Sequence, residues 1–270
     1  MITDRQLEIL INDIFEYYGY DFSGYSRASF KRRIDRIYQL ENFNDFSELL
    51  SRIRSDSVYF KTVVEEITVN VTEMFRDPHV YQILRNTILP LLAVKPFIRI
   101  WHAGCSTGEE VFSMAVLLKE ANLLHKCLLY ATDLNPAVLG VAKKGVFPLR
   151  MMQQYSENYM NSGGQNDFSD YYIANYGLAK FSEDLMERMV FSQHNLVSDS
   201  SFNEFDLILC RNVLIYFDKQ LQDKALSLFD ESLSNLGYLV LGTKETINFS
   251  PIQHKYERVN GREKIWKKIK

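Results

Sequence analysis

The sequence contains no long apolar run. None of the apolar stretches in its 270 residues reaches the roughly 18 residues that a membrane-spanning helix requires. The first residues are polar and resemble no secretory signal, so we expect a cytoplasmic protein without membrane insertion.

A strong positive charge is also absent, because the formal net charge is −3 and the pI is about 6.0. Nucleic acid is therefore not an expected partner.

Cysteine is scarce as well. The chain has three cysteines, and they are scattered without the spacing of a metal site or of a disulfide framework. Cys105 and Cys210 each stand at the end of an apolar segment that has the pattern of a strand. We expect free, buried thiols and no bound metal.

A loop with two glycines carries the first functional signal. The apolar segment 97–103 ends in Gly104-Cys105-Ser106-Thr107-Gly108, and an amphipathic segment then begins with Glu109-Glu110. This order predicts a strand, a tight turn and a helix, the opening of a nucleotide-binding β-α-β unit. The loop is not G-x-G-x-x-G and no Lys-Ser or Lys-Thr pair follows Gly108, so the pattern does not indicate a phosphate-binding loop. An ordinary buried turn is the alternative.

The second apolar run, 127–131, ends in Thr132-Asp133. An acid at the tip of the second strand is where such folds hydrogen-bond a ribose, although Asp133 is also placed to cap a helix before Pro136. The two acids that open the first helix would repel a pyrophosphate. A ligand with hydroxyls, an amine and a positive charge fits better, and S-adenosylmethionine is such a ligand.

Five segments then point to one family. They are T-V-N-V-T-E-M-F-R-D at 68–77, A-G-C-S-T-G-E-E at 103–110, A-T-D-L-N at 131–135, S-Q-H-N-L at 192–196 and C-R-N-V-L-I-Y-F-D at 210–218. In this order and rough spacing they closely resemble the glutamate O-methyltransferases of chemotaxis receptors, the CheR family. The resemblance extends from the first helices to about residue 250.

The resemblance implies a fold, a reaction and a cofactor. The fold is α/β, a class I S-adenosylmethionine-dependent methyltransferase with a Rossmann-like sheet, an N-terminal all-helical domain and a small inserted antiparallel β-subdomain. The reaction moves a methyl group from S-adenosylmethionine to glutamate carboxylates on the cytoplasmic helical domain of chemoreceptors. The products are methyl esters and S-adenosylhomocysteine. We expect a monomer.

The resemblance also assigns residues. The expected cofactor contacts are Asn70, Thr72, Arg76, Gly104, Glu109, Asp133, Asn195, Leu196, Asn212 and Val213. Three residues are expected to act in catalysis: Arg76, Asn212 and Tyr216. Arg76 either pairs with the cofactor carboxylate or orders the region of Glu109. Tyr216 either faces the acceptor carboxylate or is a core aromatic of the next helix.

The chemistry fits a carboxylate acceptor. A glutamate side chain is already ionised at neutral pH and needs no general base. Amino-methylating DNA enzymes typically carry a Pro-Pro-Tyr motif where this chain has Arg211-Asn212-Val213-Leu214. His102 and His194 flank the predicted site, and each is either a catalytic group or a packed or capping histidine.

A basic helix is expected to begin near Ser26. It carries Lys31, Arg32, Arg33 and Arg36, which either orient an acidic receptor surface or form a solvated helix face.

The expected organisation follows from the hydrophobic periodicity. Helices alone are predicted for a domain at 1–76 and for a linking segment at 77–96, and the methyltransferase domain spans 97–270. The strands we predict are 98–103, 127–132, 188–193, 205–210, 237–242, 255–260 and 264–268.

The β-subdomain is predicted at about 165–190, from an antiparallel pair at 168–174 and 178–181. In the family such a subdomain can bind a receptor tail peptide by strand addition, and a plain surface excursion is the alternative. Two other functions stay open: a methyltransferase with a different substrate, and a cofactor-binding interaction module without catalysis.

Overall fold

The computed structural model describes residues 2–68, 72–259 and 261–270. The chain forms two compact units. The first comprises Met1–Asn70 and Leu214–Lys224, and the second comprises Val71–Val213 and Ala225–Lys270. The inclusion of Leu214–Lys224 in the first unit is a grouping that the sequence did not indicate.

The first unit is helical, as predicted. Its long helices are α1 (Asp4–Tyr18), α2 (Arg27–Leu40), α3 (Phe46–Ser55) and α4 (Ser57–Ile67). Each places an apolar stripe inward at helical spacing, and side-chain caps fix three of the helix starts. Thr3 closes a capping box on α1, while Asp45 and Asp56 cap α3 and α4.

Two hydrogen bonds tie the second segment of this unit to the turn before α2. Ser26 N–H donates to the carbonyl of Tyr216 at 2.8 Å, and Asp218 N–H donates to the carbonyl of Gly24 at 2.8 Å. Leu221 packs so close to Gly24 that a Cβ there would lie 2.1 Å from its Cδ1 atom. The segment is therefore an integral part of the helical unit.

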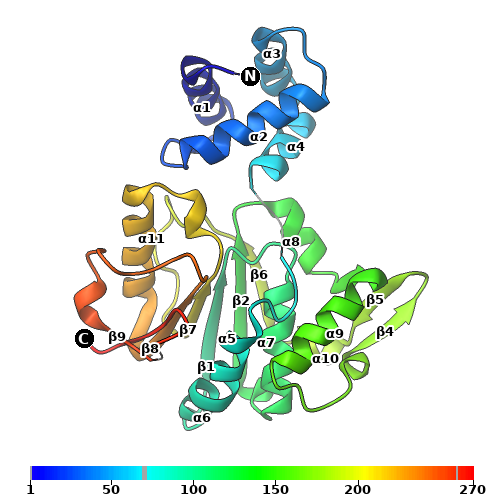
Figure 1. The fold of residues 1–270 in the computed structure, drawn as a ribbon, viewed down its shortest axis with the longest axis vertical. Coiled ribbons are helices and arrows are strands. Elements are labelled where there is room, and N and C mark those ends of the chain that lie inside the picture. Colours follow the sequence, from blue (N-terminus) through cyan, green and yellow to red (C-terminus); the bar gives the residue numbers. More distant parts are fainter. Residues whose placement is uncertain (1, 69–71, 260) are drawn as a thin grey trace. The chain divides into compact units, whose positions relative to one another are not determined.

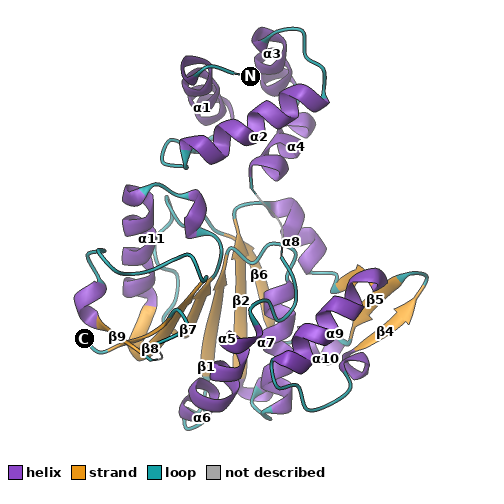
Figure 2. Ribbon diagram, viewed as in Figure 1, coloured by secondary structure: helices purple, strands orange, loops and turns teal. Residues whose placement is uncertain are grey.

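The second unit is built on a seven-stranded sheet with the order β6-β2-β1-β7-β8-β10-β9. Its strands are β1 (Ile98–Ala103), β2 (Cys127–Asp133), β6 (Met189–Gln193), β7 (Phe205–Cys210), β8 (Leu233–Leu241), β9 (Tyr256–Arg258) and β10 (Ile265–Lys268). The first five strands in this order pair in parallel, and β10 and β9 close the sheet with antiparallel pairing. The predicted α/β class I methyltransferase fold is confirmed (Figures 1 and 2).

Both faces of this sheet are covered. Ile98 and Ile100 of β1 belong to a large apolar cluster with the segment 78–92 and with α7 (Glu109–Glu120). On the opposite face, the ring of Trp101 lies 5.5 Å from that of Phe229 on α11 (Lys219–Ser232). Alternate residues of one strand thus face two different layers, and the buried strands position their carboxyl ends rigidly.

The predicted linking helix contains a π-helical turn. It runs as α5 (Pro78–Ile83), the π turn Leu84–Ile88 and α6 (Leu89–Leu92). Pro90 has no backbone N–H for the usual bond four residues back, and its ring crowds the preceding turn, which explains the wider turn before it.

The predicted β-subdomain is present as a three-stranded antiparallel sheet with the order β3-β5-β4. Its strands are β3 (Val146–Pro148), β4 (Tyr172–Asn175) and β5 (Leu178–Phe181). The predicted strand at 168–174 was too early, because Phe168–Tyr171 is a 3-10 turn that buries both aromatic rings. Strand β3 was not predicted, since it is only three residues long and ends in proline.

The remaining helices of the second unit include α8 (Pro136–Ala142), α9 (Met152–Asn161) and α10 (Glu183–Met186). Strand β8 begins at Leu233, before the predicted start at 237, because the pairing with β7 continues across an irregularity near Leu236. The three cysteines are free and buried, as predicted. Within the described residues, no helix is long and apolar enough to cross a membrane.

Candidate active site

The glycine turn lies at the carboxyl end of β1. Gly104 has a φ of +77°, and a Cβ there would lie 2.5 Å from Cγ2 of Val213. The N–H groups of Gly104 and Cys105 both donate to the carbonyl of Thr132 at the end of β2. Gly108 has a φ of +97°, and its carbonyl accepts from Phe112 N–H at 3.0 Å in the first turn of α7. The turn therefore brings the ends of β1, β2 and β7 together, and the close approach of Val213 leaves no room for a side chain at Gly104.

Asp133 ends β2 beside this turn. Its Oδ2 atom accepts from Ser106 N–H at 2.9 Å, and its Oδ1 atom accepts from Asn135 N–H at 2.9 Å. The helix cap of α8 is Asn135, whose side chain accepts from Ala137 N–H, so Asp133 is not the cap. Burial raises the pKa of Asp133, although these N–H groups act against the shift. Each carboxylate oxygen keeps acceptor capacity for a hydroxyl group.

Glu109 opens α7 and is only 7% exposed. Thr107 Oγ1 donates to its Oε2 atom at 2.6 Å. Burial raises the pKa of Glu109 to about 6, while hydrogen bonds that include those from Thr107 and Tyr155 act in the opposite direction. Tyr155 lies on α9, the helix between strands β3 and β4 of the β-subdomain, so this part of the chain also contributes a hydrogen bond to Glu109.

Asn212 and Val213 follow β7. Asn212 has a φ of +62°, and its N–H donates to Glu245 Oε2 at 3.0 Å. The same oxygen accepts from Gly242 N–H at the end of β8. Glu245 is 4% exposed and fixes the tip of β7 from the loop that follows β8, a role that was not predicted from the sequence.

Asn195 and Leu196 follow β6. His194 N–H donates to the carbonyl of Asp133 at 3.2 Å, which ties this segment to the end of β2. Asn195 Oδ1 accepts from Val197 N–H at 2.9 Å, and Leu196 is buried. The segment is therefore positioned at the same edge of the sheet as Gly104 and Asp133.

The loop 72–77 carries Thr72 and Arg76, both half-buried. Phe75 and Asp77 in this loop have φ values of +52° and +56°. The remaining predicted contact, Asn70, lies outside the described residues.

A buried charge network lies between this loop and the end of β7. Glu110 Oε1 lies 2.9 Å from His102 Nδ1, and Glu110 Oε2 lies 3.3 Å from Arg211 Nη1. Arg211 Nη2 also lies 2.7 Å from Asp77 Oδ2. Burial acts to raise the pKa of Glu110, but His102 and Arg211 hold it below its usual value. His102 is thus a packed partner of Glu110.

His194 is also packed. It is 8% exposed, and its Nε2 atom lies 3.3 Å from the carbonyl oxygen of Ser200. Its ring lies against those of Trp101 and Phe202.

The four predicted basic residues lie on α2 of the helical unit. Arg32 and Arg36 are exposed, Lys31 and Arg33 are half-buried, and Lys31 Nζ lies 2.6 Å from Asp4 Oδ1. A shallow groove of about 440 Å³ is lined by Ala28, Lys31, Arg32, Asp35, Arg36 and Gln39. Tyr216 belongs to the same unit and is half-buried, while the adjacent Phe217 is the buried aromatic.

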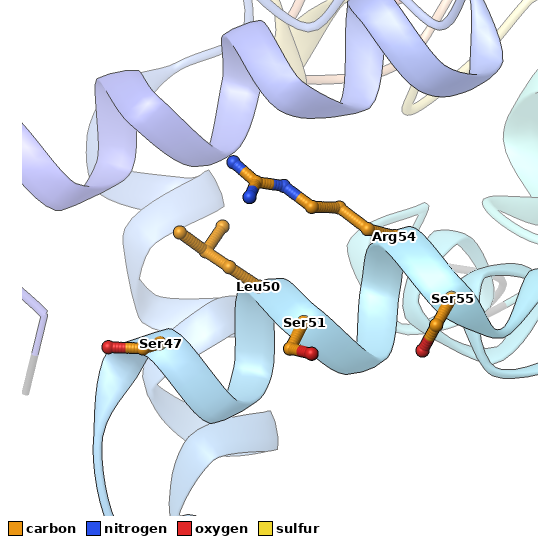
Figure 3. Close-up of a pocket in the computed structure, with 5 residues that line it drawn as sticks. All are labelled: Ser47, Leu50, Ser51, Arg54 and Ser55. Atoms are coloured by element: carbon orange, nitrogen blue, oxygen red, sulfur yellow. The ribbon is translucent and has the colours of Figure 1, made fainter.

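A second shallow pocket, of about 300 Å³, lies on α3 (Figure 3). Its side chains are Ser47, Leu50, Ser51, Arg54 and Ser55, spaced along the helix. Arg54 pairs with Asp13 at 2.7 Å, so its charge is already compensated. We assign this pocket no function.

The carboxyl edge of the sheet fits S-adenosylmethionine. Two carboxylates, Asp133 and Glu109, are held there at a desolvation cost that raises both pKa values. Hydroxyls and a cationic ligand relieve that cost, whereas a phosphate increases it. Among the described residues, no cluster of three or more His, Cys, Asp or Glu side chains is arranged to hold a metal ion.

Comparison with known proteins identifies the family. The model of the all-alpha domain of CheR methyltransferases matches residues 5–68, and the model of their SAM-binding domain matches residues 70–265. A Pseudomonas putida protein named "Putative methyltransferase Cher3" is 46% identical over 268 residues, which cover 98% of this chain and 97% of the relative.

Two further relatives carry names that state a process. A "Chemotaxis protein methyltransferase" of Listeria monocytogenes is 32% identical over 231 residues, 85% of each chain. "Chemotaxis protein methyltransferase 2" of Pseudomonas aeruginosa is 32% identical over 239 residues, 85% of this chain and 79% of the relative. Since the two family models together span nearly the whole sequence, this chain belongs to the CheR methyltransferase family and is an S-adenosylmethionine-dependent methyltransferase.

Proposed function

We propose that this protein transfers a methyl group from S-adenosylmethionine to glutamate side chains of chemoreceptors in the cytoplasm. The products are glutamate 5-O-methyl esters and S-adenosylhomocysteine, and the process is sensory adaptation. The observation that carries the proposal is the assembly of Gly104, Asp133 and Asn212 at one sheet edge in a chain of this family. Relatives named as chemotaxis protein methyltransferases support the choice of substrate.

In this proposal most of the cofactor contacts come from the second unit. Asp133 accepts hydrogen bonds from the two ribose hydroxyls, and Gly104 allows the backbone to approach the ligand closely. Glu109 accepts from the amino group at the methionine end, while Asn195 and Leu196 flank the adenine. Bound S-adenosylmethionine supplies an activated methyl group on a sulfonium.

The chain's own residues then align the acceptor. Methyl transfer is an in-line displacement, and it requires the nucleophile at about 3–3.5 Å from the methyl carbon. A glutamate carboxylate is ionised at neutral pH, so the site needs no general base. Asn212 and Val213 border the methyl group, and Tyr216 orients the acceptor carboxylate. Thr72, Arg76 and Asn70 complete the cofactor contacts, with Arg76 beside the cofactor carboxylate.

Two surfaces are proposed to recognise the receptor. The basic face of α2, with Lys31, Arg32, Arg33 and Arg36, orients an acidic helical bundle through complementary charge. The edge strand β4 offers unpaired backbone groups and an exposed Ile173 to a receptor tail by strand addition. The enzyme acts as a monomer.

The decisive experiment is transfer of a tritiated methyl group into membranes that contain candidate receptors. We expect label in the receptor that is released as methanol by mild base, because a methyl ester is base-labile. Label that resists base would reject the ester and favour a methyltransferase with another substrate. Binding of S-adenosylmethionine without transfer to any receptor would favour an interaction module.

A further inference from the structure

The loop 72–77 adopts a backbone that its own residues do not favour. Phe75 and Asp77 both lie in the left-handed region, with φ values of +52° and +56°. This conformation is energetically unfavourable for residues other than glycine, and it persists only where surrounding contacts stabilise it. The loop therefore depends on contacts from outside itself.

Two of these contacts come from helices. Asn158 Nδ2 on α9 donates to the carbonyl of Met74 at 2.9 Å. Ser113 Oγ on α7 accepts from Phe75 N–H at 2.9 Å and donates to the carbonyl of Glu109 at 2.7 Å. The loop backbone is thus linked to the helix turn that carries the buried acid of the site.

The third contact comes from the tip of β7. Arg211 Nη2 donates to the carbonyl of Arg76 at 2.8 Å and to Asp77 Oδ2 at 2.7 Å. Its Nη1 atom donates to Glu110 Oε2 at 3.3 Å. The Arg211 side chain is only 3% exposed, so these groups satisfy a charge that is almost completely withdrawn from water.

Arg211 also immediately precedes Asn212 in the chain. One planar guanidinium therefore connects the strand tip that carries Asn212 and Val213 to the loop that carries Thr72 and Arg76. A fork of several donors in fixed geometry achieves this, whereas the ammonium of lysine is a point charge.

We propose that Arg211 is a positioning residue for the cofactor site. It fixes the loop 72–77 against the carboxyl end of β7 and so holds Thr72 and Arg76 in place to bind S-adenosylmethionine. The inference rests on the cofactor contacts of the proposed function but not on the identity of the methyl acceptor.

The test compares the two ends of β7. Arg211→Met removes the cation at the carboxyl end, and Lys95→Met removes the cation that pairs with Asp206 at the amino end. Calorimetric titration with S-adenosylmethionine and thermal unfolding of the unliganded protein are measured for both. We expect Arg211→Met to weaken cofactor binding at least tenfold, and Lys95→Met to stay within about twofold of the wild type.

Graded variants separate positioning from general stability. Arg211→Lys keeps the charge without the fork and is expected to weaken binding by an intermediate factor. Asp77→Asn removes the charge of a half-exposed partner of Arg211 and keeps its shape. This variant replaces Arg211→Met in the test if Arg211→Met does not fold. Each variant should raise the KM for S-adenosylmethionine more than it lowers kcat, and hydrogen exchange should quicken at the amide of Phe75.

Two results would overturn the inference. One is a folded Arg211→Met or Asp77→Asn variant with wild-type cofactor affinity. The other is a loss of affinity in Lys95→Met that matches the loss in Arg211→Met at equal thermal destabilisation. The proposed function fails separately, if the wild type itself does not bind S-adenosylmethionine or methylates no receptor.

Discussion

The proposed cofactor edge of the large sheet and the proposed receptor surfaces use polar groups in opposite ways. At the sheet edge, Asp133 and Glu109 are largely shielded from water, and each accepts a hydrogen bond, at 2.9 Å from Ser106 N–H and at 2.6 Å from Thr107 Oγ1. On α2, Arg32 and Arg36 are exposed, and on β4 the Ile173 side chain is 76% exposed. A single buried group with fixed partners can contribute strongly to the free energy of binding. A single exposed charge contributes little, and salt screens its effect. Substitutions should therefore separate the two regions.

The largest effect is expected at Asp133. Asp133→Ala should weaken S-adenosylmethionine binding by about 1.5–3 kcal/mol, the scale for a lost charged hydrogen bond. That corresponds to roughly ten- to a hundredfold in Kd, which calorimetry measures directly. Asp184→Ala is the matched control, because Asp184 is an acid in an exposed ion pair with Lys119. Wild-type affinity of a folded Asp133→Ala variant would remove this residue from the site.

The next effect concerns the basic face of α2. Changing Arg32, Arg33 and Arg36 together to Glu should leave cofactor affinity intact and lower receptor methylation at least about tenfold at low salt. Reversal of three exposed cations of the second unit, Lys143, Lys144 and Arg150, gives the same change in net charge and should have a much smaller effect.

The salt dependence sharpens this prediction. Wild-type methylation should fall as ionic strength rises, and the α2 variant should show less of that fall. Normal methylation by the α2 variant at low salt would make this face an ordinary solvated surface.

A smaller, pH-dependent effect is expected at Glu109. Its pKa of about 6 predicts that the carboxylate becomes protonated between pH 7 and pH 5. Affinity for S-adenosylmethionine should then fall about five- to tenfold over this range, and Glu109→Gln should abolish the dependence. A wild-type affinity that is flat across pH 6 would contradict the proposed contact with the cofactor amine.

The same carboxyl group affects stability with a definite sign. The pKa of Glu109 in the folded protein, about 6, lies above the ordinary 4.5. Between these two values the folded protein binds the proton more tightly than the unfolded chain, so the protonated Glu109 stabilises the fold. This stabilisation is lost as the pH rises through about 6. The unliganded Glu109→Gln variant should therefore be more stable than the wild type at pH 8, by up to about 2 kcal/mol.

At saturating cofactor the rate of methylation should change little from pH 6.5 to 8, and a steep rise would implicate a histidine.

The smallest effect is expected at β4. Ile173→Lys should change the free energy of unfolding by no more than about 0.5 kcal/mol, because the side chain is largely exposed. Methylation should fall only for receptors that carry a tail peptide. If Ile173→Lys affects receptors with and without a tail alike, strand addition at β4 is excluded.

Local patterns predicted much of the fold and the positions of Gly104 and Asp133 within it. Gly104 directly follows an apolar run, and Asp133 follows another after Thr132, so their places at the ends of β1 and β2 could be predicted from adjacent residues. The seven predicted strands of the large sheet are all present, and the buried strands β1 and β7 have the strongest apolar signal. The three-residue strand β3 leaves too little signal to detect.

The supporting contacts could not be predicted in this way. Arg211 and Asp77 are 134 positions apart, and Asn212 and Glu245 are 33 positions apart. No periodicity links residues at such separations, because their contact depends on how the strands pair. The only sequence signal was indirect: Arg211 lies within a family motif whose neighbouring residues we did assign.

The discontinuity of the helical unit has a consequence for biosynthesis. Its second segment, Leu214–Lys224, is translated long after Met1–Asn70, yet Leu221 fills the space beside Gly24 and the ring of Phe217 lies 5.2 Å from that of Tyr25. The nascent amino-terminal helices must therefore leave the ribosome with this patch uncovered and wait for most of the catalytic region to be made. An excised fragment 1–70 would carry the same gap permanently, so a complete helical domain cannot be obtained by simple truncation.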